Sequence, residues 1–223
     1  MADNQSPSSV LYISFGSAAQ LEEQQFLEVA HGLADSKQPF LWVMRPGFIK
    51  GSEGTELLPK WFLDLVGERG RIVKWAPQQV LAHKAIGAFC THNGWNSTSE
   101  SICEGVPMIC SPFWGDQPLD ARYVSDVLKI GIYLENGWAK EEIASAIRRV
   151  MVEEERDEIK KRTKCLKEKL SILLQLSVLA LPLNRYLMDF HVLQAQIMAM
   201  QIRVWAIYAP YEKLFGAIPG LLG

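Results

Sequence analysis

The stretch Ile86–Glu100, which reads IGAFCTHNGWNSTSE, contains a complete strand-to-helix connection. Ile86–Cys90 is a short apolar run of the kind that forms a buried strand. Thr91–Gly94 follows as a polar loop, and the Asn, Ser and Thr of Trp95–Thr98 favour the start of a helix. Gly105, with a proline two residues later, ends that helix. These residues predict one β–α unit.

The same alternation of strand and helix patterns runs through most of the chain, from about residue 10 to about residue 170. The other expected strands are Val10–Phe15, Phe40–Met44, Ile72–Lys74, Met108–Cys110 and Gly131–Leu134. The other expected helices are Phe26–Leu33, Pro77–His83, Leu119–Leu128 and Lys140–Val152, and residues from about 45 to about 58 are expected to form a loop. Strands separated by helices predict an α/β fold with a Rossmann-like, doubly wound parallel sheet.

Composition and charge exclude several classes of protein. The 223 residues are 48% apolar and 22% charged, with a net charge of −2, which is typical of a folded domain and gives no reason to expect nucleic acid as a partner. The cysteines form no CxxC pair and are expected to be reduced thiols: Cys90, Cys103, Cys110 and Cys165. Residues 1–9 are polar and lack the apolar segment of a secretory signal, so a cytoplasmic location is expected.

The sequence changes character towards its C-terminal end. Glu153–Lys169 mixes both charges densely and predicts a solvated helix face. Ser171–Gly223 is strongly apolar, but its longest uncharged run, Leu170–Asn184, is shorter than the ~18 residues of a membrane span. Two interpretations stay open: a tail that contacts a membrane surface, a protein or itself, or an extension without selected function. We therefore divide the chain into a linker (1–9), a ligand-binding domain (10–170) and an atypical apolar tail (171–223).

Two strand-to-helix turns offer backbone N–H groups to an anion. Ser14–Ser17 is a weak signal alone, and neither the dinucleotide pattern GxGxxG nor the P-loop pattern occurs there. Around Thr91–Gly94, the helix N-terminus, the His92 imidazole and the hydroxyls of Ser97 and Thr98 converge on one point. An anion of phosphate size would fit there.

Polar and aromatic residues near this point suit the rest of a nucleotide sugar. Glu100 lies on the same helix face as Asn96, where its carboxylate can accept hydrogen bonds from a ribose diol. Trp75 offers a flat face for a base, and Asp116-Gln117 follow a strand at the edge where open α/β sheets bind ligands. Taken singly, each residue has a structural alternative: a core Trp95, a loop histidine or a helix-capping aspartate.

The order of these residues resembles the donor-binding signature of plant family-1 UDP-dependent glycosyltransferases, which lies in the C-terminal domain of a two-domain GT-B fold. The matching segments are WAPQ at Trp75–Gln78, THNGWNSTSE at Thr91–Glu100, EGVPM at Glu104–Met108 and DQP at Asp116–Pro118. Two further segments are similar to those of members that glucosylate terpenoids and flavonoids in plant secondary metabolism: SICEGVPMIC and ARYVSDVLKIGIYLENGW.

The resemblance implies a role for each matching residue. Trp75 would stack on uracil with Ala76 bonding it through the backbone, and Gln78 and Glu100 would bind ribose. Ser17, His92, Asn96 and Ser97 would surround the pyrophosphate, while Trp95, Asp116 and Gln117 would touch the sugar, for which a terminal Gln implies glucose. The full UDP-sugar-binding set is Ser17, Trp75, Ala76, Gln78, His92, Asn93, Gly94, Trp95, Asn96, Ser97, Thr98, Ser99, Glu100, Asp116 and Gln117.

The chain departs from the family pattern in four ways. One residue is missing between Gln79 and Val80, Ser99 stands where the family has Leu, the tail after Leu170 is unlike the family's C-terminal helix, and the N-terminal half is absent. In the family that half carries the catalytic His, its Asp partner and the acceptor pocket, so no catalytic residue is expected in this chain.

The resemblance implies an inverting transfer of a hexosyl group, glucosyl by the Gln, from a UDP-sugar to a hydroxyl of a small lipophilic acceptor. No metal or other cofactor is expected, and no DxD pair occurs. This chain would act as the donor-binding half and would meet an acceptor only if an N-terminal half is supplied. The alternative is a truncated, non-catalytic module that binds UDP-sugar or an interaction partner.

Overall fold

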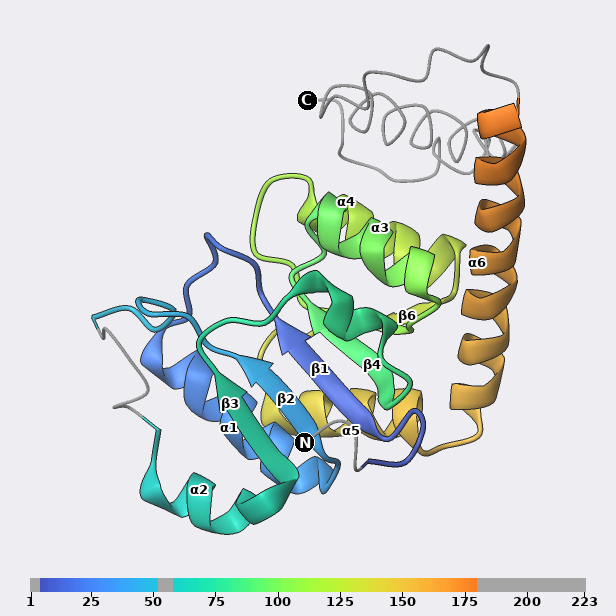
Figure 1. Cartoon of the computed structure of the whole chain (residues 1–223). Coiled ribbons are helices and arrows are strands. Elements are labelled where there is room, and N and C mark those ends of the chain that lie inside the picture. The colour runs from blue at the N-terminus through green and yellow to red at the C-terminus, as the bar shows by residue number, and fades with distance from the viewer. Residues whose placement is uncertain (1–4, 52–57, 180–223) are drawn as a thin grey trace. The chain divides into compact units, whose positions relative to one another are not determined.

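The computed structural model describes residues 5–51 and 58–179, and within them the chain forms a six-stranded parallel sheet (Figure 1). The strands are β1 Val10–Ser14, β2 Phe40–Val43, β3 Gly70–Val73, β4 Ile86–Thr91, β5 Met108–Cys110 and β6 Gly131–Tyr133. Their order is β3-β2-β1-β4-β5-β6, with every neighbouring pair parallel. The order reverses between β1 and β4, and ligands of open α/β sheets bind at the carboxyl ends of the strands at such a point.

Helices cover both faces of the sheet, which confirms the predicted α/β fold class. The helices are α1 Glu23–Ser36, α2 Lys60–Val66, α3 Trp95–Glu104, α4 Gln117–Arg122, α5 Lys140–Met151 and α6 Glu155–Leu179, with 3-10 turns η3 Gly67–Arg69 and η4 Gln78–Ala82 and a π-helical segment η5 Tyr123–Val127. In Figure 1, α1 and α5 lie together against one face, while α3 and η4 lie against the other.

Each face of the sheet has its own apolar core. On the α1 and α5 side, the buried side chains of Leu11 and Ile13 from β1 meet Phe26, Leu33 and Ile147. The other side has a smaller cluster, whose buried members are Val10, Tyr12, Leu81, Ala85, Ile86, Phe89 and Val106. Alternate residues of β1 thus enter opposite cores, as the period of a strand buried on both faces requires.

Three local features differ from the sequence-based expectations. Helix α2 was not predicted, because it is only seven residues long and buries just Phe62 and Val66. The helix expected over Leu119–Leu128 starts earlier, at Gln117, and changes to a π-helix at Tyr123. The helix expected over Pro77–His83 is the 3-10 helix η4, Gln78–Ala82, at whose start the backbone N–H of Val80 donates to the Pro77 carbonyl at 3.1 Å.

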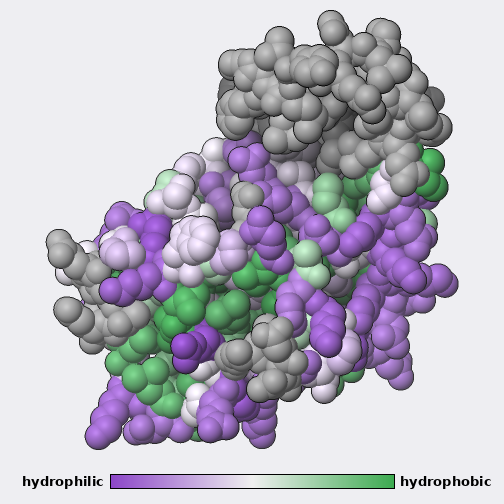
Figure 2. All heavy atoms as spheres, viewed as in Figure 1, coloured by the Kyte–Doolittle hydropathy of each residue, from purple (hydrophilic) through white to green (hydrophobic). Residues whose placement is uncertain are grey.

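Helix α6 confirms the solvated face predicted for its charged first half. Figure 2 shows a hydrophilic surface along this helix, and only one side of it is buried, through Ile159, Thr163 and Leu170. The Lys167 ammonium donates to the carbonyl and the carboxylate of Glu104 at 3.1 and 3.2 Å, which fastens α6 to the end of α3.

The last part of the tail, residues 180–223, lies outside the described residues, and so do the contacts predicted for it. The chain divides into two units, Met1–Gln175 and Leu176–Gly223. No helix in the described part of the chain is long and apolar enough to cross a membrane.

Candidate functional site

The His92 imidazole is packed between two glycines at the point where the strand order reverses. Gly16 follows β1 with a φ of +72°, and a Cβ built there would lie 2.7 Å from His92 Cε1. At Gly94, a Cβ would lie 2.5 Å from His92 Nε2. No side chain fits at either position without moving the imidazole. The turn after β1 and the loop after β4 therefore both pack directly against this ring.

Asn93 fixes the shape of the loop between β4 and α3. Its side chain is fully buried and its backbone is left-handed, with a φ of 58°. The backbone N–H donates to Thr91 Oγ1 at 3.3 Å, and the side-chain Nδ2 donates to Cys110 Sγ at 3.3 Å. Asparagine tolerates this conformation better than most residues. Asn93 therefore acts as a rigid corner beneath the site, and its buried Oδ1 has no hydrogen-bond partner within residues 5–51 and 58–179.

Helix α3 begins at this corner with an open N-terminus. Gly94 is the N-cap and no side chain caps the first turn. Asn96 is exposed and Ser97 is half-buried, which leaves both free to meet a ligand with the adjoining backbone N–H groups. Thr98 is buried, and neither its Oγ1 nor the Nε1 of Trp95 has a hydrogen-bond partner in the described part of the chain. The hydroxyl of Thr98 thus points into the protein, whereas that of Ser97 is accessible.

Burial shifts the pKa of two site residues. The pKa of His92 is lowered because burial disfavours the imidazolium, and the Asp116 carboxylate opposes this shift. The pKa of Glu100 is raised, again by burial. Below neutral pH, His92 therefore keeps its neutral form longer than an exposed histidine does.

The loop between β5 and α4 carries Asp116 and Gln117. Asp116 is exposed at the N-cap of α4. Gln117 is 7% exposed, and its Oε1 accepts the backbone N–H groups of Phe113 and Trp114 at 2.9 and 3.2 Å. The Gln117 side chain thus braces the loop with its oxygen and leaves its Nε2 without a partner among the described residues. Trp114, between these groups, is 49% exposed.

The residues predicted to hold the base lie beyond the edge strand β3. Trp75 is 74% exposed, while Ala76 packs against the smaller core and Gln78 opens η4. Because η4 contacts α3, this segment lies beside the helix that carries Glu100. The residues predicted to bind the donor therefore follow the carboxyl ends of the strands, from Trp75 after β3 to Asp116 after β5. Ser17, after β1, is exposed next to Gly16.

Residues 3–169 match the family described as UDP-glucoronosyl and UDP-glucosyl transferase. The chain belongs to this family. UDP-glycosyltransferase 76G1 of Stevia rebaudiana is 66% identical over 171 residues, which are 76% of this chain and 37% of that protein. UDP-glycosyltransferase 76E1 of Solanum lycopersicum is 47% identical over 217 residues, which are 97% of this chain and 43% of that protein. The predicted resemblance to plant UDP-dependent glycosyltransferases is confirmed.

A solved structure of the same family has the same fold. A UDP-glucose: anthocyanidin 3-O-glucosyltransferase in complex with UDP superposes with a TM-score of 0.71 at 32% identity, over 77% of this chain and 37% of that one. The chain spans about two fifths of the length of its curated relatives. The similarity to the Solanum lycopersicum protein continues past Leu170, where the sequence predicted a departure from the family.

Two departures from the glycosyltransferase pattern are accommodated locally. The Ser99 hydroxyl donates to the Asn96 carbonyl at 2.9 Å, so it has the partner that a hydroxyl in place of Leu needs. After Gln79, where the pattern lacks a residue, the chain closes in 3-10 turns and Leu81 is still buried, at 3% exposed.

Sequence reasoning missed Asp120. It lies one turn after Asp116 in α4, and its buried Oδ2 has no hydrogen-bond partner among the residues that the structure describes. Burial, followed by the nearby Asp116 carboxylate, raises the pKa of Asp120 to about 6. Its spacing of four residues from Asp116 was the available signal.

Within the described residues, no group of three or more His, Cys, Asp or Glu side chains is arranged to hold a metal ion. All four cysteines are free, with Cys90 and Cys110 buried and Cys165 exposed. Burial raises the pKa of Cys90 to about 12, so this thiol is inert at neutral pH.

Proposed function

We propose that this chain supplies the UDP-sugar-binding half of an inverting glycosyltransferase, which moves a glucosyl group to a hydroxyl of a small lipophilic acceptor. The observation that carries the proposal is the His92 imidazole held between Gly16 and Gly94, beside the uncapped N-terminus of α3. This arrangement presents N–H donors at the point where α/β sheets bind phosphates. The free thiols agree with a reducing compartment, the cytoplasm.

The diphosphate would lie over the N-terminus of α3. Ser17, Asn96 and Ser97 are accessible around it, and a neutral His92 can donate one ring N–H. Hydrogen bonds to an anion are stronger than hydrogen bonds between neutral groups. Because the loop between β4 and α3 is already held in place, little conformational entropy would be lost on binding.

The remaining parts of the donor extend in both directions from the diphosphate. Uracil would stack on Trp75, and the ribose diol would bond Glu100 and Gln78. In the other direction, the Asp116 carboxylate and the free Nε2 of Gln117 would bond the hydroxyls of the sugar. The UDP bound by the anthocyanidin glucosyltransferase supports this assignment, and its name supports glucose as the sugar.

Transfer breaks the bond between the anomeric carbon and the β-phosphate oxygen. The acceptor oxygen attacks the opposite face of the sugar and loses its proton to a base, while UDP leaves with the bonding electrons. Negative charge develops on the β-phosphate, where N–H groups that are already in place stabilise it most effectively.

The general base and the acceptor pocket are proposed to come from the N-terminal half that relatives possess. His31 stacks on Trp61 on the α1–α2 surface, with ring centroids 4.2 Å apart. His83 Nδ1 accepts the backbone N–H of Ala85 at 3.2 Å, and His92 is packed between the glycines. His191 lies outside the described residues. The three described histidines thus have other contacts.

Calorimetry of the chain with UDP and with UDP-glucose tests donor binding directly. We expect both to bind, and no binding at millimolar UDP would overturn the proposal. Turnover is then measured with and without the N-terminal half of the Stevia rebaudiana relative. Glucosyl transfer only in the presence of that half is expected. Transfer by the chain alone would contradict the external base, and donor binding without transfer in either case would favour the non-catalytic module.

A further inference from the structure

Four aromatic side chains, which we call the loop-aromatic cluster, lie beneath the proposed donor site: Phe15, Phe48, Phe113 and Trp138. Each comes from a different connection at the carboxyl ends of the strands. Phe15 directly precedes Gly16, and Phe113 precedes Asp116 by three residues. Trp138 lies between β6 and α5, outside every segment assigned to the donor.

Trp138 contacts both loops that reach the donor. Its indole meets the Phe15 ring edge-on, with centroids 5.3 Å apart and planes at 85°, and it meets Phe113 at 5.2 Å. Phe15 and Phe113 also contact each other edge-on at 5.8 Å. Such contacts have preferred geometries, so the three rings set the spacing between the turn after β1 and the loop before α4.

The segment that carries Trp138 is itself firmly held. The Glu142 carboxylate accepts the backbone N–H groups of Glu135 and Asn136. The Glu135 carboxylate pairs with both terminal nitrogens of Arg122 at 2.6 Å, which ties the segment to the end of α4. Trp138 is thus presented from a fixed support.

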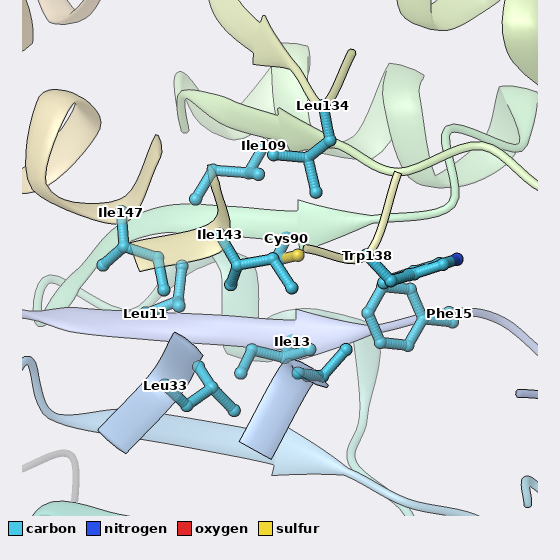
Figure 3. A pocket seen from close by; sticks show the side chains of 11 residues that line it. Leu11, Ile13, Phe15, Leu33, Cys90, Ile109, Leu134, Trp138, Ile143 and Ile147 are labelled. Carbon is cyan, nitrogen blue, oxygen red and sulfur yellow. The ribbon is translucent and has the colours of Figure 1, made fainter. Parts of the chain in front are cut away.

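Below these rings the core has a small void. The cavity has a volume of about 10 Å³, and its lining includes Phe15 and Trp138. Figure 3 shows the Trp138 indole next to the Phe15 ring. The other lining residues are Leu11, Ile13, Val29, Leu33, Cys90, Ile109, Leu134, Ile143 and Ile147. Phe15 and Trp138 thus both border this void, and the indole packs edge-on against the Phe15 ring.

The two donor loops differ in their other supports. Arg45 also holds the turn after β1, because its guanidinium donates to the carbonyls of Gly16 and Ala19, and His92 packs on the same turn. The loop before α4 has the side chain of Gln117 as its internal brace. The loop before α4 should therefore depend more strongly on Trp138.

We infer that Trp138 is a positioning residue that holds the loop carrying Asp116 and Gln117 at the spacing that a UDP-sugar requires. The inference rests on the proposed function and adds a residue that touches no part of the donor. Small displacements of positioning groups cost substantial binding or rate.

Calorimetry on three variants tests this role. In Trp138→Leu the ratio of the UDP-glucose to the UDP dissociation constant should rise about tenfold, since the sugar loop moves while the phosphate turn stays held. Trp138→Phe should keep the ratio within about twofold, because a ring remains. Phe62→Leu is the matched control, because Phe62 is buried against Phe40, at the amino end of β2, with centroids 6.0 Å apart.

Hydrogen exchange supplies a second readout that needs no ligand. The backbone amides of Phe113 and Trp114 donate to Gln117 Oε1. Their exchange rates should rise about tenfold in Trp138→Leu and should not change in Phe62→Leu. An unchanged ratio of dissociation constants, or equal effects in the two Leu variants, would overturn the positioning role alone. If the unmodified chain binds no UDP, the proposed function fails, and the exchange rates still decide the role of Trp138.

Discussion

The phosphate end and the base end of the proposed donor site are built in opposite ways. At the phosphate end, Asn93 is fully buried and His92 is packed against Gly16 and Gly94. At the base end, Trp75 is 74% exposed and follows an edge strand. One end is assembled before the ligand arrives, whereas the other presents an apolar surface that a base would cover.

This difference separates two sources of affinity. A preassembled anion site loses little entropy on binding, but every group in it must keep its place. An exposed indole gains from covering its face and tolerates changes around it. Substitutions at the phosphate end should therefore disturb both the fold and binding, and substitutions at the base end should disturb binding alone.

Gly16→Ala should give the largest effect on binding. The new Cβ would lie 2.7 Å from His92 Cε1, so the imidazole must move, and we expect UDP affinity to fall by about 3 kcal/mol. Gly51→Ala is the matched control, since Gly51 has a φ of +79° and nothing within 4 Å of an added Cβ. Both variants carry the strain of a left-handed alanine, of about 1–2 kcal/mol. Equal losses of UDP affinity in calorimetry would show that His92 packing is not what matters.

Trp75→Ala should weaken UDP binding by about 2 kcal/mol while leaving the free energy of unfolding within about 0.5 kcal/mol. The indole is largely exposed, so little folded-state packing is lost. Trp61→Ala removes another exposed indole, on α2, and should not change UDP affinity. Calorimetry and urea unfolding measure the two quantities. A Trp75→Ala protein that binds UDP as before would refute the stacking assignment.

The sequence predicted the fold best where both strand faces are buried. The central strands β1, β4 and β5 are largely buried and lie within about one residue of the predicted runs. The edge strand β3 is only partly buried and spans Gly70–Val73, where Ile72–Lys74 was predicted. Helix α2 escaped prediction because seven residues with two buried side chains give no clear period. Its position comes from packing against α1, a tertiary contact that local pattern does not encode.

The sequence predicted which residues form the candidate site, but it did not predict the contacts that hold those residues in place. The family pattern pointed to His92, but its packing against Gly16 joins positions 76 residues apart and needed the strand order. Gln117 was predicted to touch the sugar, but the sequence did not indicate that its Oε1 accepts two backbone N–H groups of the same loop. Trp138 ends a segment that resembles the family, but it lies outside every segment assigned to the donor. Motifs identify groups that meet a ligand, whereas the groups that hold them depend on three-dimensional contacts.

Asp120→Asn tests what the burial of a carboxyl costs in α4, one turn after Asp116. The pKa of Asp120 is raised to about 6, above the value of about 4 in an unfolded chain, so the folded protein binds this proton more tightly. Its contribution to stability is present below pH 4 and is lost as pH rises through about 6.

At pH 7 the free energy of unfolding of Asp120→Asn should therefore be about 1 kcal/mol higher than that of the parent, after allowance for the partial exposure of this carboxyl. At pH 4 the two should be equal. Urea unfolding at both pH values measures the difference, and Asp35→Asn controls for the removal of one negative charge from an exposed helix position. A stabilisation that is the same at pH 4 and pH 7 would rule out the titration of Asp120 as its source.

Two serines of α3 give the smallest expected effects and the sharpest contrast. Ser97, in the open first turn, should lose about 0.5–1 kcal/mol of UDP affinity on substitution by Ala, as a hydroxyl that bonds the diphosphate would. Ser99 already donates to the Asn96 carbonyl at 2.9 Å, so Ser99→Ala should change UDP affinity by less than about 0.3 kcal/mol. Each variant removes one hydroxyl and keeps the helix, and the two positions are two residues apart. Calorimetry that found Ser99 to be the more sensitive position would place the diphosphate on a different face of α3 and break the division between the two ends.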